Sequence, residues 1–203
     1  MDKPLRVLVV EDSEDDALLV MRELEPGGYD TTFERVETAE DMTAALEKQA
    51  ADIIIADYRL PHFSAPAVLE LLKETGLDLP FIVISGTVGE ETAVAMMKDG
   101  AHDYLMKDNL KRLVPAVERE LYEAEMRKER KQAEEELKLR ALLLDSANDS
   151  INLADFDGNL LYVNEAFCRS NGYSRGELIG MNLHQLDIPH DVMKTLTFQS
   201  VIN

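Results

Sequence analysis

The sequence predicts an α/β fold in which residues 1–120 form a doubly wound, five-stranded parallel sheet. Short apolar runs alternate with amphipathic helical segments over residues 5–120, and this alternation favours parallel strands joined by right-handed helical crossovers. One run, Ile53 to Ala56, contains no polar residue and is rich in β-branched side chains, which is typical of a strand buried on both faces. We therefore expect helices on both faces of the sheet.

Each element can be assigned in order from its local pattern. Leu5 to Val10 is the first strand, and the helix after it ends at Pro26-Gly27-Gly28, residues that interrupt a helix. The second strand, Thr31 to Val36, is more polar and is expected at a sheet edge. Thr38 and Asp41 form a Thr-x-x-Asp capping box that opens the next helix. The later elements are the strand Ile53–Ala56, a helix after Pro61, the strand Phe81–Ile84, a helix over Thr92–Asp99 closed by Gly100, the strand Tyr104–Met106 and a helix from near Leu110.

Residues 121–144 are expected to form a helical linker, since the stretch from Glu118 to Lys138 lacks Pro and Gly and consists mostly of strong helix formers. Its apolar residues follow a 3/4 spacing that changes phase. A solvated single helix and a parallel coiled coil with a phase break both fit. We favour the coiled coil, and hence a homodimer, because an isolated polar helix is only marginally stable in water. The first phase contains Leu110, Leu113, Val117, Leu121 and Ala124, and the second Ala133, Leu137 and Leu144.

Residues 145–203 have a different pattern, which predicts the N-terminal part of a small α+β domain. Ile151–Ala154 and Leu160–Val163 flank a turn at Asp157-Gly158-Asn159, the arrangement of a β-hairpin. Asn164 then caps a helix that carries Phe167 and Cys168. One hairpin and short helices are too little for a self-sufficient core, so we expect this domain to be truncated.

Composition excludes several classes of function. Acidic residues outnumber basic ones 40 to 21, for a formal charge of −19, and this balance disfavours nucleic acid as a direct partner. The single cysteine, Cys168, rules out an intramolecular disulfide. No apolar stretch approaches the length of a membrane-spanning helix, so we expect a cytoplasmic protein with no membrane contact in this segment.

Polar residues with complementary chemistry end four of the predicted strands. In the flavodoxin-like order 2-1-3-4-5 the first and third strands are neighbours, so Glu11-Asp12 and Asp57 would meet at one edge of the sheet. Their converging carboxylates invite a divalent cation, and hard oxygen ligands favour Mg²⁺ over zinc. Ser85 and Lys107 end the fourth and fifth strands at that edge. The chemistry that suits this set is phosphoryl transfer, with Asp57 as nucleophile and with Lys107 and Ser85 binding the phosphoryl group.

Residues 5–120 resemble the receiver domain of two-component response regulators. The resemblance implies that Asp57 accepts a phosphoryl group from a phosphohistidine on a partner histidine kinase. It further implies that Glu11, Asp12, Asp57 and the backbone carbonyl of Arg59 hold Mg²⁺, and that Ser85 and Tyr104 are a switch pair that moves on phosphorylation. The matching motifs are Val9-Val10-Glu11-Asp12, Ile55-Ala56-Asp57-Tyr58-Arg59-Leu60-Pro61, Val83-Ile84-Ser85-Gly86 and Gly100-Ala101-His102-Asp103-Tyr104-Leu105-Met106-Lys107.

One position departs from the family pattern. Receiver domains often have a proline after the conserved lysine, commonly joined by a cis peptide, but Asp108 follows Lys107 here. A cis bond before a non-proline residue costs roughly 2.5–4 kcal/mol, so we expect a trans bond. Asp108 also adds a carboxylate near the lysine, and Arg59 and Thr87 flank the site at positions expected to tune the access of water to the acyl phosphate.

Residues from about 140 resemble the start of a PAS sensory domain. The two signature stretches are Asp157-Gly158-Asn159-Leu160-Leu161-Tyr162-Val163-Asn164-Glu165-Ala166-Phe167 and Gly172-Tyr173-Ser174-Arg175-Gly176-Glu177-Leu178-Ile179-Gly180. The expected domains are thus a receiver at 1–120, a helical linker at 121–144 and a partial PAS domain at 145–203. Flavin and haem are not supported, because the Cys-containing signature of flavin-linked light sensors is missing and Cys168 fits a small buried hydrophobe beside Phe167.

Competing functions fit the residues less well. A sensor-kinase phosphohistidine at His190 is disfavoured because Ile188-Pro189-His190-Asp191 fits a PAS loop. An aspartyl-phosphate hydrolase needs an acid two residues after its nucleophile, where Arg59 stands. A nucleotide-binding enzyme needs a Gly-rich loop after the first strand, where Glu11-Asp12-Ser13-Glu14 stands.

We therefore expect a phosphoacceptor module of two-component signal transduction and not an enzyme in its own right. Phosphorylation at Asp57 would be relayed through the helix to the PAS domain of a larger regulator or hybrid kinase. The alternative is a receiver-like scaffold that binds proteins without being phosphorylated.

Overall fold

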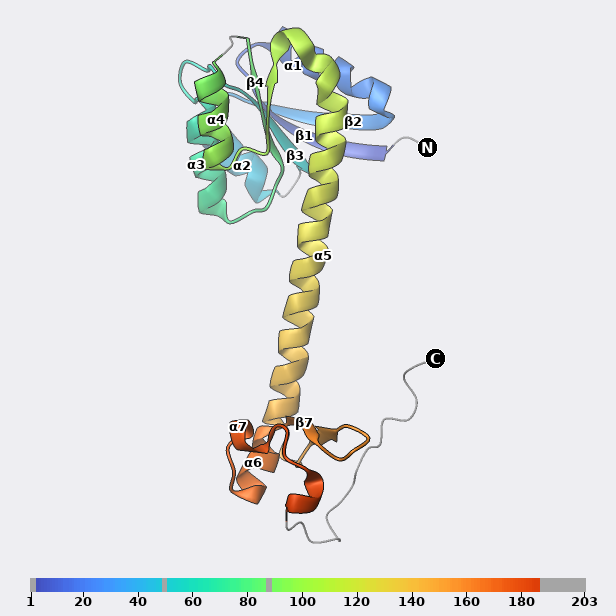
Figure 1. The fold of residues 1–203 in the computed structure, drawn as a ribbon. Helices are drawn as coiled ribbons and strands as arrows, with labels where there is room; N and C mark the ends of the chain where they lie inside the picture. The colour runs from blue at the N-terminus through green and yellow to red at the C-terminus, as the bar shows by residue number, and fades with distance from the viewer. Residues whose placement is uncertain (1–2, 49–50, 87–88, 187–203) are drawn as a thin grey trace. The chain divides into compact units, whose positions relative to one another are not determined.

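The computed structural model describes residues 3–48, 51–86 and 89–186, which fall into two compact units, Met1–Glu129 and Arg130–Asn203. Figure 1 shows the sheet and most of the helices in the first unit and the small β6–β7 sheet in the second. Within the described residues, no helix is both long enough and apolar enough to cross a membrane.

The first unit contains the predicted sheet. Its strands lie in the order β2-β1-β3-β4-β5 and all neighbours run parallel, so the predicted topology is confirmed. The polar second strand is at an edge, as expected. The third strand is buried on both faces, with Ile53 to Ala56 no more than 1% exposed. The strands are β1 (Lys3–Val10), β2 (Tyr29–Val36), β3 (Ile53–Asp57), β4 (Phe81–Ser85) and β5 (Asp103–Met106).

Two helical layers cover the sheet (Figure 1). One core packs α1 and α5 against one face, and the other packs α2, α3 and Met96 of α4 against the opposite face. This division follows from the alternating direction of side chains along each strand, which supplies two apolar faces to be covered. The helical segments of this unit are α1 (Glu14–Leu24), η1 (Glu25–Gly27), α2 (Ala39–Glu47), α3 (Ala65–Thr75), α4 (Glu90–Asp99), η2 (Lys107–Arg112) and α5 (Leu113–Ser146).

Local signals in the sequence fix most helix ends. The Thr38 hydroxyl accepts a hydrogen bond from the Asp41 amide at the start of α2, as the capping motif predicts. Gly100 ends α4 with φ 109°, a left-handed conformation that favours glycine. The last helix of the unit differs from the prediction, since the segment after β5 first forms the 3₁₀ turn η2, and regular α-helix begins only at Leu113. Asn109 inside η2 has non-helical φ −133° and ψ 47°, which explains the delayed start.

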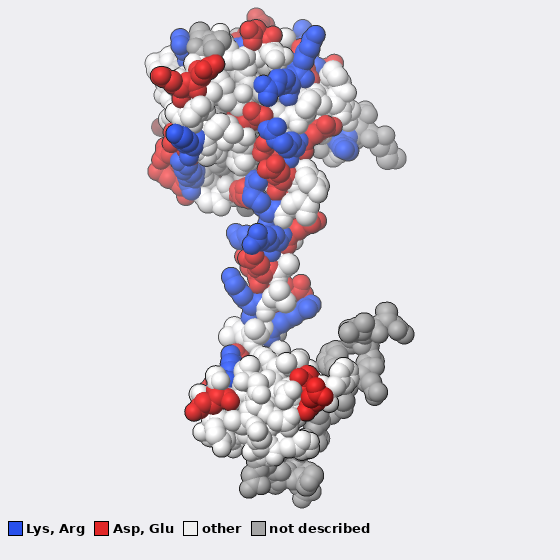
Figure 2. Space-filling view, viewed as in Figure 1, with Lys and Arg blue, Asp and Glu red and all other residues white. Residues whose placement is uncertain are grey.

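The change of phase along α5 has a structural cause in its first half. Leu113 and Val117 are fully buried against the sheet, and Leu121 packs at the margin of the same core. These positions are therefore used by the first unit itself. Leu137 of the second phase is 63% exposed, and the turns between the two phases are mostly charged, as the blue and red side chains along the middle of α5 show in Figure 2. The first-phase residues that pack against the sheet are thus not available for a coiled coil, which stays a prediction.

The second unit contains the predicted hairpin and helix. Strands β6 (Asn152–Ala154) and β7 (Leu160–Val163) pair antiparallel with one irregularity between Leu153 and Ala154. Asn164 caps α6 (Glu165–Asn171) by accepting a hydrogen bond from the Phe167 amide. Cys168 is buried in the small core of this unit, as expected. Two short segments follow, α7 (Arg175–Leu178) and η3 (Leu183–Gln185), whereas His190 lies outside the described residues.

Candidate functional site

The site lies at the carboxyl edge of the sheet, where four strands end. Asp57 is the last residue of β3 and Ser85 the last residue of β4. Glu11 follows β1 directly, and Lys107 follows β5 directly. Strand β1 pairs in register with β3, so that Val10 lies opposite Ala56, and this register brings the residues after both strands to the same place. Open α/β sheets bind their ligands at this edge.

Lys107 is the centre of the site. Its ammonium donates hydrogen bonds to Glu11 Oε2 at 3.0 Å, to Asp57 Oδ2 at 2.9 Å and to Asp16 Oδ2 at 2.5 Å. Burial acts to lower the pKa of Lys107, but the three carboxylates outweigh it and raise the pKa above its ordinary value. Lys107 is therefore a fixed positive charge at neutral pH, and it can bind an anion that approaches Asp57.

Glu11 is the most buried carboxyl group of the site, with its side chain 5% exposed. Burial raises its pKa, and a contact with Asp12 adds to this effect. Hydrogen bonds from Lys107 and from the Ser13 amide, which reaches Oε1 at 3.1 Å, act in the opposite direction. A second positive charge near Glu11 would therefore favour its ionised form.

Asp57 is held at both carboxylate oxygens. Oδ2 accepts the hydrogen bond from Lys107, and Oδ1 accepts one from the Arg59 amide at 3.2 Å. The backbone of the next residue is also fixed, because the Tyr58 amide donates to the Ile84 carbonyl at 2.8 Å. The side chain keeps 12% of its surface exposed. A carboxylate so oriented and still open to solvent can react as a nucleophile.

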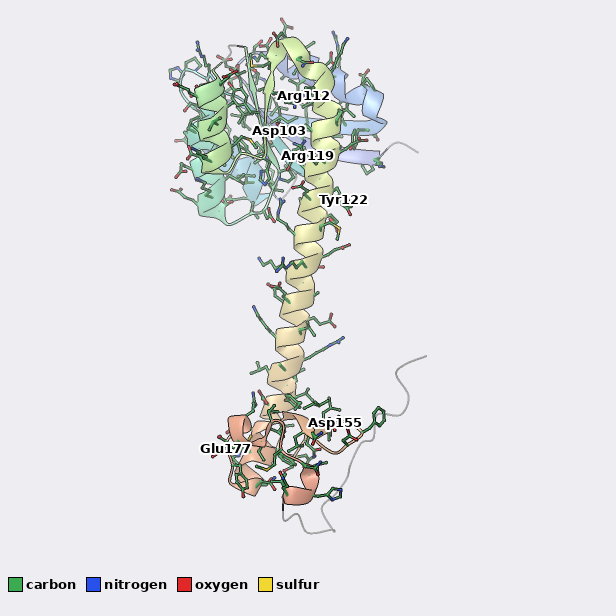
Figure 3. The ribbon with its side chains drawn as sticks, in the orientation of Figure 1. Asp103, Arg112, Arg119, Tyr122, Asp155 and Glu177 are labelled. Atoms are coloured by element: carbon green, nitrogen blue, oxygen red, sulfur yellow. The ribbon has the colours of Figure 1, made fainter. Side chains whose placement is uncertain are left out.

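The predicted switch residues lie beside this site. Ser85 is buried, at 1% exposure. The half-buried Tyr104 ring packs edge-on against Tyr58, with ring centroids 6.3 Å apart and an interplanar angle of 63°. Next to Tyr104, Asp103 accepts hydrogen bonds from the Tyr104 amide and from Arg119 of α5, a pair that can be followed in Figure 3. Helix α5 thus contacts the strand residue that precedes Tyr104.

In the described part of the chain, the remaining predicted residues are more exposed than Glu11, Asp57 and Lys107. The Asp12 carboxylate is exposed, and its backbone carbonyl accepts a hydrogen bond from Arg35 at 3.3 Å. The peptide bond between Lys107 and Asp108 is trans, as expected, since the described residues contain no cis peptide. Asp108 itself is exposed. Thr87 lies outside the described residues.

Two residues at the site were missed in the sequence. Asp16, from the first turn of α1, makes the shortest of the three contacts to Lys107. Arg35, from the end of β2, also donates to the Glu11 carbonyl at 3.0 Å and pairs with Glu37. The sequence does place Asp16 in the first turn of α1, three residues after its cap Ser13, and so near the same sheet edge, but this position does not show that its side chain contacts Lys107. Arg35 had no comparable signal.

The chemistry of the carboxylates fits Mg²⁺, although their present arrangement favours Lys107. No set of three or more His, Cys, Asp or Glu side chains in the described ranges is already spaced to hold a metal ion. Glu11 and Asp57 instead converge on the ammonium of Lys107. Both offer hard carboxylate oxygens, and Asp57 is still partly open to water; the magnesium ion prefers a few such oxygens together with water. The donor set is thus suitable for Mg²⁺.

Two family models match this chain. The response regulator receiver domain matches residues 7–118, which cover the five-stranded sheet and the site. The PAS fold matches residues 138–199. Together the matches cover both units and agree with the resemblances seen in the sequence.

Similar proteins and structures agree with this result. The chain is 33% identical over 99 residues to the luminescence regulatory protein LuxO of Vibrio campbellii. It is 35% identical over 129 residues to the nitrogen assimilation regulatory protein NtrX of Azorhizobium caulinodans. Among solved structures, the signal receiver domain of a LuxO-type repressor from Vibrio parahaemolyticus is 30% identical, with a TM-score of 0.55 over 62% of this chain and 95% of that one.

The curated relatives are longer proteins that share only part of their length with this chain. The match covers 49% of this chain but 21% of LuxO, and 61% of this chain but 27% of NtrX. It covers 51% of this chain and 44% of the response regulator MprA of Mycolicibacterium vanbaalenii.

Proposed function

The chain belongs to the response regulator receiver domain family, and from this premise we propose that Asp57 accepts a phosphoryl group, in the cytoplasm, from a phosphohistidine on a partner histidine kinase. The observation that carries the proposal is the placement of Asp57. One of its oxygens is 2.9 Å from the Lys107 ammonium, the other is held by the Arg59 amide, and the side chain remains partly open to solvent.

The transfer is a displacement at phosphorus. A carboxylate oxygen of Asp57 forms a bond to phosphorus as the P–N bond of the phosphohistidine breaks. The electron pair of that bond stays with the imidazole, which leaves neutral when its other nitrogen carries a proton. Lys107 would bind a phosphoryl oxygen and offset its charge, and Ser85 would bind another. The chain would act as a regulated acceptor, with its own phosphorylation and slow dephosphorylation as its only reactions.

Magnesium is the cofactor that this site would use. Glu11, Asp12, Asp57 and the backbone carbonyl of Arg59 are the residues proposed to hold it, and the ion would supply positive charge to the phosphoryl oxygens. The carboxylate of Glu11 is buried beside Lys107, so it is already held at the edge of the sheet where this charge is needed.

The signal would travel from Asp57 to α5. We propose that phosphorylation moves Ser85 and Tyr104 and so changes the packing of β5 and α5. The hydrogen bond from Arg119 to Asp103, the neighbour of Tyr104, supports this route. The helical linker (121–144) would pass the change to the PAS segment (145–203) of a larger regulator or hybrid kinase, in a homodimer formed through the linker and the PAS segment.

Labelling with a small phosphodonor tests the acceptor role. The full chain is incubated with acetyl phosphate and Mg²⁺, and the phosphorylated residue is located by mass spectrometry. We expect one alkali-labile, hydroxylamine-labile phosphoryl group on Asp57, lost in Asp57→Asn. The matched control is Asp52→Asn, which removes an aspartate just before the same strand and should keep the label.

The same experiment separates the receiver from a receiver-like scaffold. A scaffold would bind protein partners and take no label with or without Mg²⁺. Labelling that persisted in Asp57→Asn would place the acceptor elsewhere and overturn the assignment. Labelling that occurred equally well after removal of divalent cations with EDTA would leave Asp57 as the acceptor and overturn the role of Mg²⁺.

A further inference from the structure

We infer that Asp16 is a positioning residue that restrains phosphorylation of Asp57 by competing with the incoming phosphoryl group for Lys107. The inference rests on the proposed function, because it assigns a role in the reaction to a residue outside the predicted site. Asp16 acts through Lys107 and has no contact with Asp57 of its own among the hydrogen bonds and ion pairs of the described residues.

The hydrogen bonds of Lys107 create this competition. An ammonium group has three N–H donors, and all three are used by Glu11, Asp57 and Asp16. A phosphoryl oxygen can therefore be bound by Lys107 only if one carboxylate gives up its donor. The contact to Asp16 is the shortest of the three, at 2.5 Å.

Asp16 is the carboxylate best placed to release the lysine. Its side chain is 42% exposed, compared with 5% for Glu11 and 12% for Asp57. Water can replace the lost partner of an exposed carboxylate at small cost, whereas a buried carboxylate would be left without compensation. The backbone of Asp16 is fixed by Ser13, whose hydroxyl accepts its amide hydrogen bond at 3.2 Å, so the side chain returns to Lys107 when the phosphoryl group leaves.

The net negative charge of the site determines which ligand the carboxylate of Asp16 favours. Three carboxylates surround one ammonium, so the site repels a phosphoryl group and attracts a divalent cation. Neutralising Asp16 weakens that repulsion and frees a donor of Lys107, which favours phosphorylation. The same change weakens the attraction for Mg²⁺. A residue with a purely structural role would affect both properties in the same direction, because a distorted site binds both ligands less well.

The test compares Asp16→Asn with two matched variants in the full chain. Asp15→Asn removes the same charge from the same helical turn at an exposed position that makes no ion pair among the described residues, and Asp16→Glu keeps the charge. Mg²⁺ affinity is measured by calorimetry. The initial rate of labelling by acetyl phosphate is then measured at a Mg²⁺ concentration that saturates each variant, and Asp16→Ser serves as a second neutral variant if Asp16→Asn does not fold.

We expect Asp16→Asn to be labelled about three to ten times faster than the wild type and to bind Mg²⁺ more weakly by a similar factor. Asp15→Asn and Asp16→Glu should stay near the wild-type values. An unchanged or slower rate in Asp16→Asn would overturn the inference while leaving the acceptor role of Asp57 intact. Equal rates in Asp16→Asn and Asp15→Asn would also overturn it. A wild-type chain that took no label would overturn the proposed function itself.

Discussion

Arg127 of α5 holds Asp78 through two parallel hydrogen bonds, from Nε to Oδ2 and from Nη2 to Oδ1, each 3.0 Å long. Asp78 lies between α3 and β4, at the edge of the sheet opposite Asp57. Nη2 of the same guanidinium lies 3.3 Å from Nε2 of His102, which precedes β5. The Arg127 side chain thus joins α5 to two loops, the one before β4 and the one before β5. This contact lies further along α5 than Glu120, the last buried residue of the helix.

The first prediction is that Arg127→Met loosens this part of α5. The paired guanidinium is partly exposed, so the loss in stability of the first unit should be modest, about 0.5–1 kcal/mol, and smaller at high salt. Amide hydrogen exchange over residues 121–129 should become faster, since few buried contacts hold this stretch. Arg130→Met is the control, because Arg130 pairs only with Glu134 on the same helix among the described residues. Equal exchange in both variants would show that the contact to Asp78 does not anchor the helix.

The second prediction concerns pH. His102 Nδ1 accepts a hydrogen bond from the Phe81 amide at 3.1 Å, while Arg127 faces Nε2. Burial lowers the pKa of His102 below its ordinary value of 6.5, and Arg127 adds to this effect, whereas Glu120, Asp78 and Glu123 oppose it. The ring faces donors at both nitrogens, so its protonated form, which carries a hydrogen on each, fits poorly.

The sign of the effect follows from this lowered pKa. The unfolded chain binds the proton more readily than the folded chain, so the contribution of His102 to stability is complete above about pH 6.5 and is lost as the pH falls toward the folded pKa. Urea unfolding of the wild type and His102→Asn, between about pH 5 and about pH 8, should show a smaller difference in stability at the acid end. His62→Asn, at an exposed histidine, is the control for the replacement of a histidine by asparagine. A difference that grew on acidification would contradict the assignment.

The sequence was sufficient for the parts of this fold that depend on local patterns. The β3 run and the Thr38 cap are local, and both were correctly placed. The convergence of Asp57 and Lys107 was also predictable, although 50 residues separate them, because the parallel topology itself brings strand ends together. Features that follow from a local pattern, or from the parallel topology that such patterns imply, can therefore be predicted from one sequence.

Contacts between side chains of separate helices and loops could not be predicted in this way. Asp16 and Lys107 are 91 residues apart, and Arg127 and Asp78 are 49 apart. In each case a charged residue on a helix resembles any other solvated charge until the rotation of that helix against the sheet is known. The 3₁₀ turn η2 before α5 was not predicted for a related reason, since the non-helical Asn109 follows from the path of the chain after Lys107 and not from a Pro or Gly signal.

The third prediction concerns the contact between α5 and β5. Arg119 donates to Asp103 at 2.6 Å and to Glu120 at 2.8 Å, and both carboxylates are nearly buried. Because Arg119 is itself half exposed, Arg119→Met should cost about 1–2 kcal/mol of stability, which urea unfolding would measure. If the route through Tyr104 is correct, the variant should also be labelled normally at Asp57. Phosphorylation should then change the amide hydrogen exchange of α5 less in this variant than in the wild type, and this change is the exchange response.

The control for this variant is Arg112→Met. Arg112 is an exposed arginine of η2 with no ion pair among the described residues (Figure 3). Its substitution should leave both stability and the exchange response near the wild-type values. A phosphorylation-dependent exchange response in Arg119→Met equal to that of the wild type would show that the signal does not pass through the contact with Asp103.

The last prediction concerns the second unit. The fully buried Asn164 uses all of its hydrogen-bonding groups. Its Oδ1 accepts from the amides of Ile151 and Phe167, and its Nδ2 donates to the carbonyls of Leu144 and Asp149. The side chain therefore joins the end of α5, the start of the hairpin and the cap of α6.

Asn164→Ala removes the cap of α6 and leaves two carbonyls and two amides of the surrounding backbone without their partner. We expect a loss of about 3 kcal/mol in the stability of this unit, seen as faster exchange of the Phe167 amide and a lower melting temperature for the second unit. Asn171→Ala also removes a side-chain amide from α6. Asn171 is the last residue of that helix and donates only within it, to the Phe167 carbonyl among other partners, so this substitution should lower the stability of the unit much less. Similar losses in the two variants would mean that the second unit does not depend on Asn164, and that α5 is joined to the hairpin by other contacts.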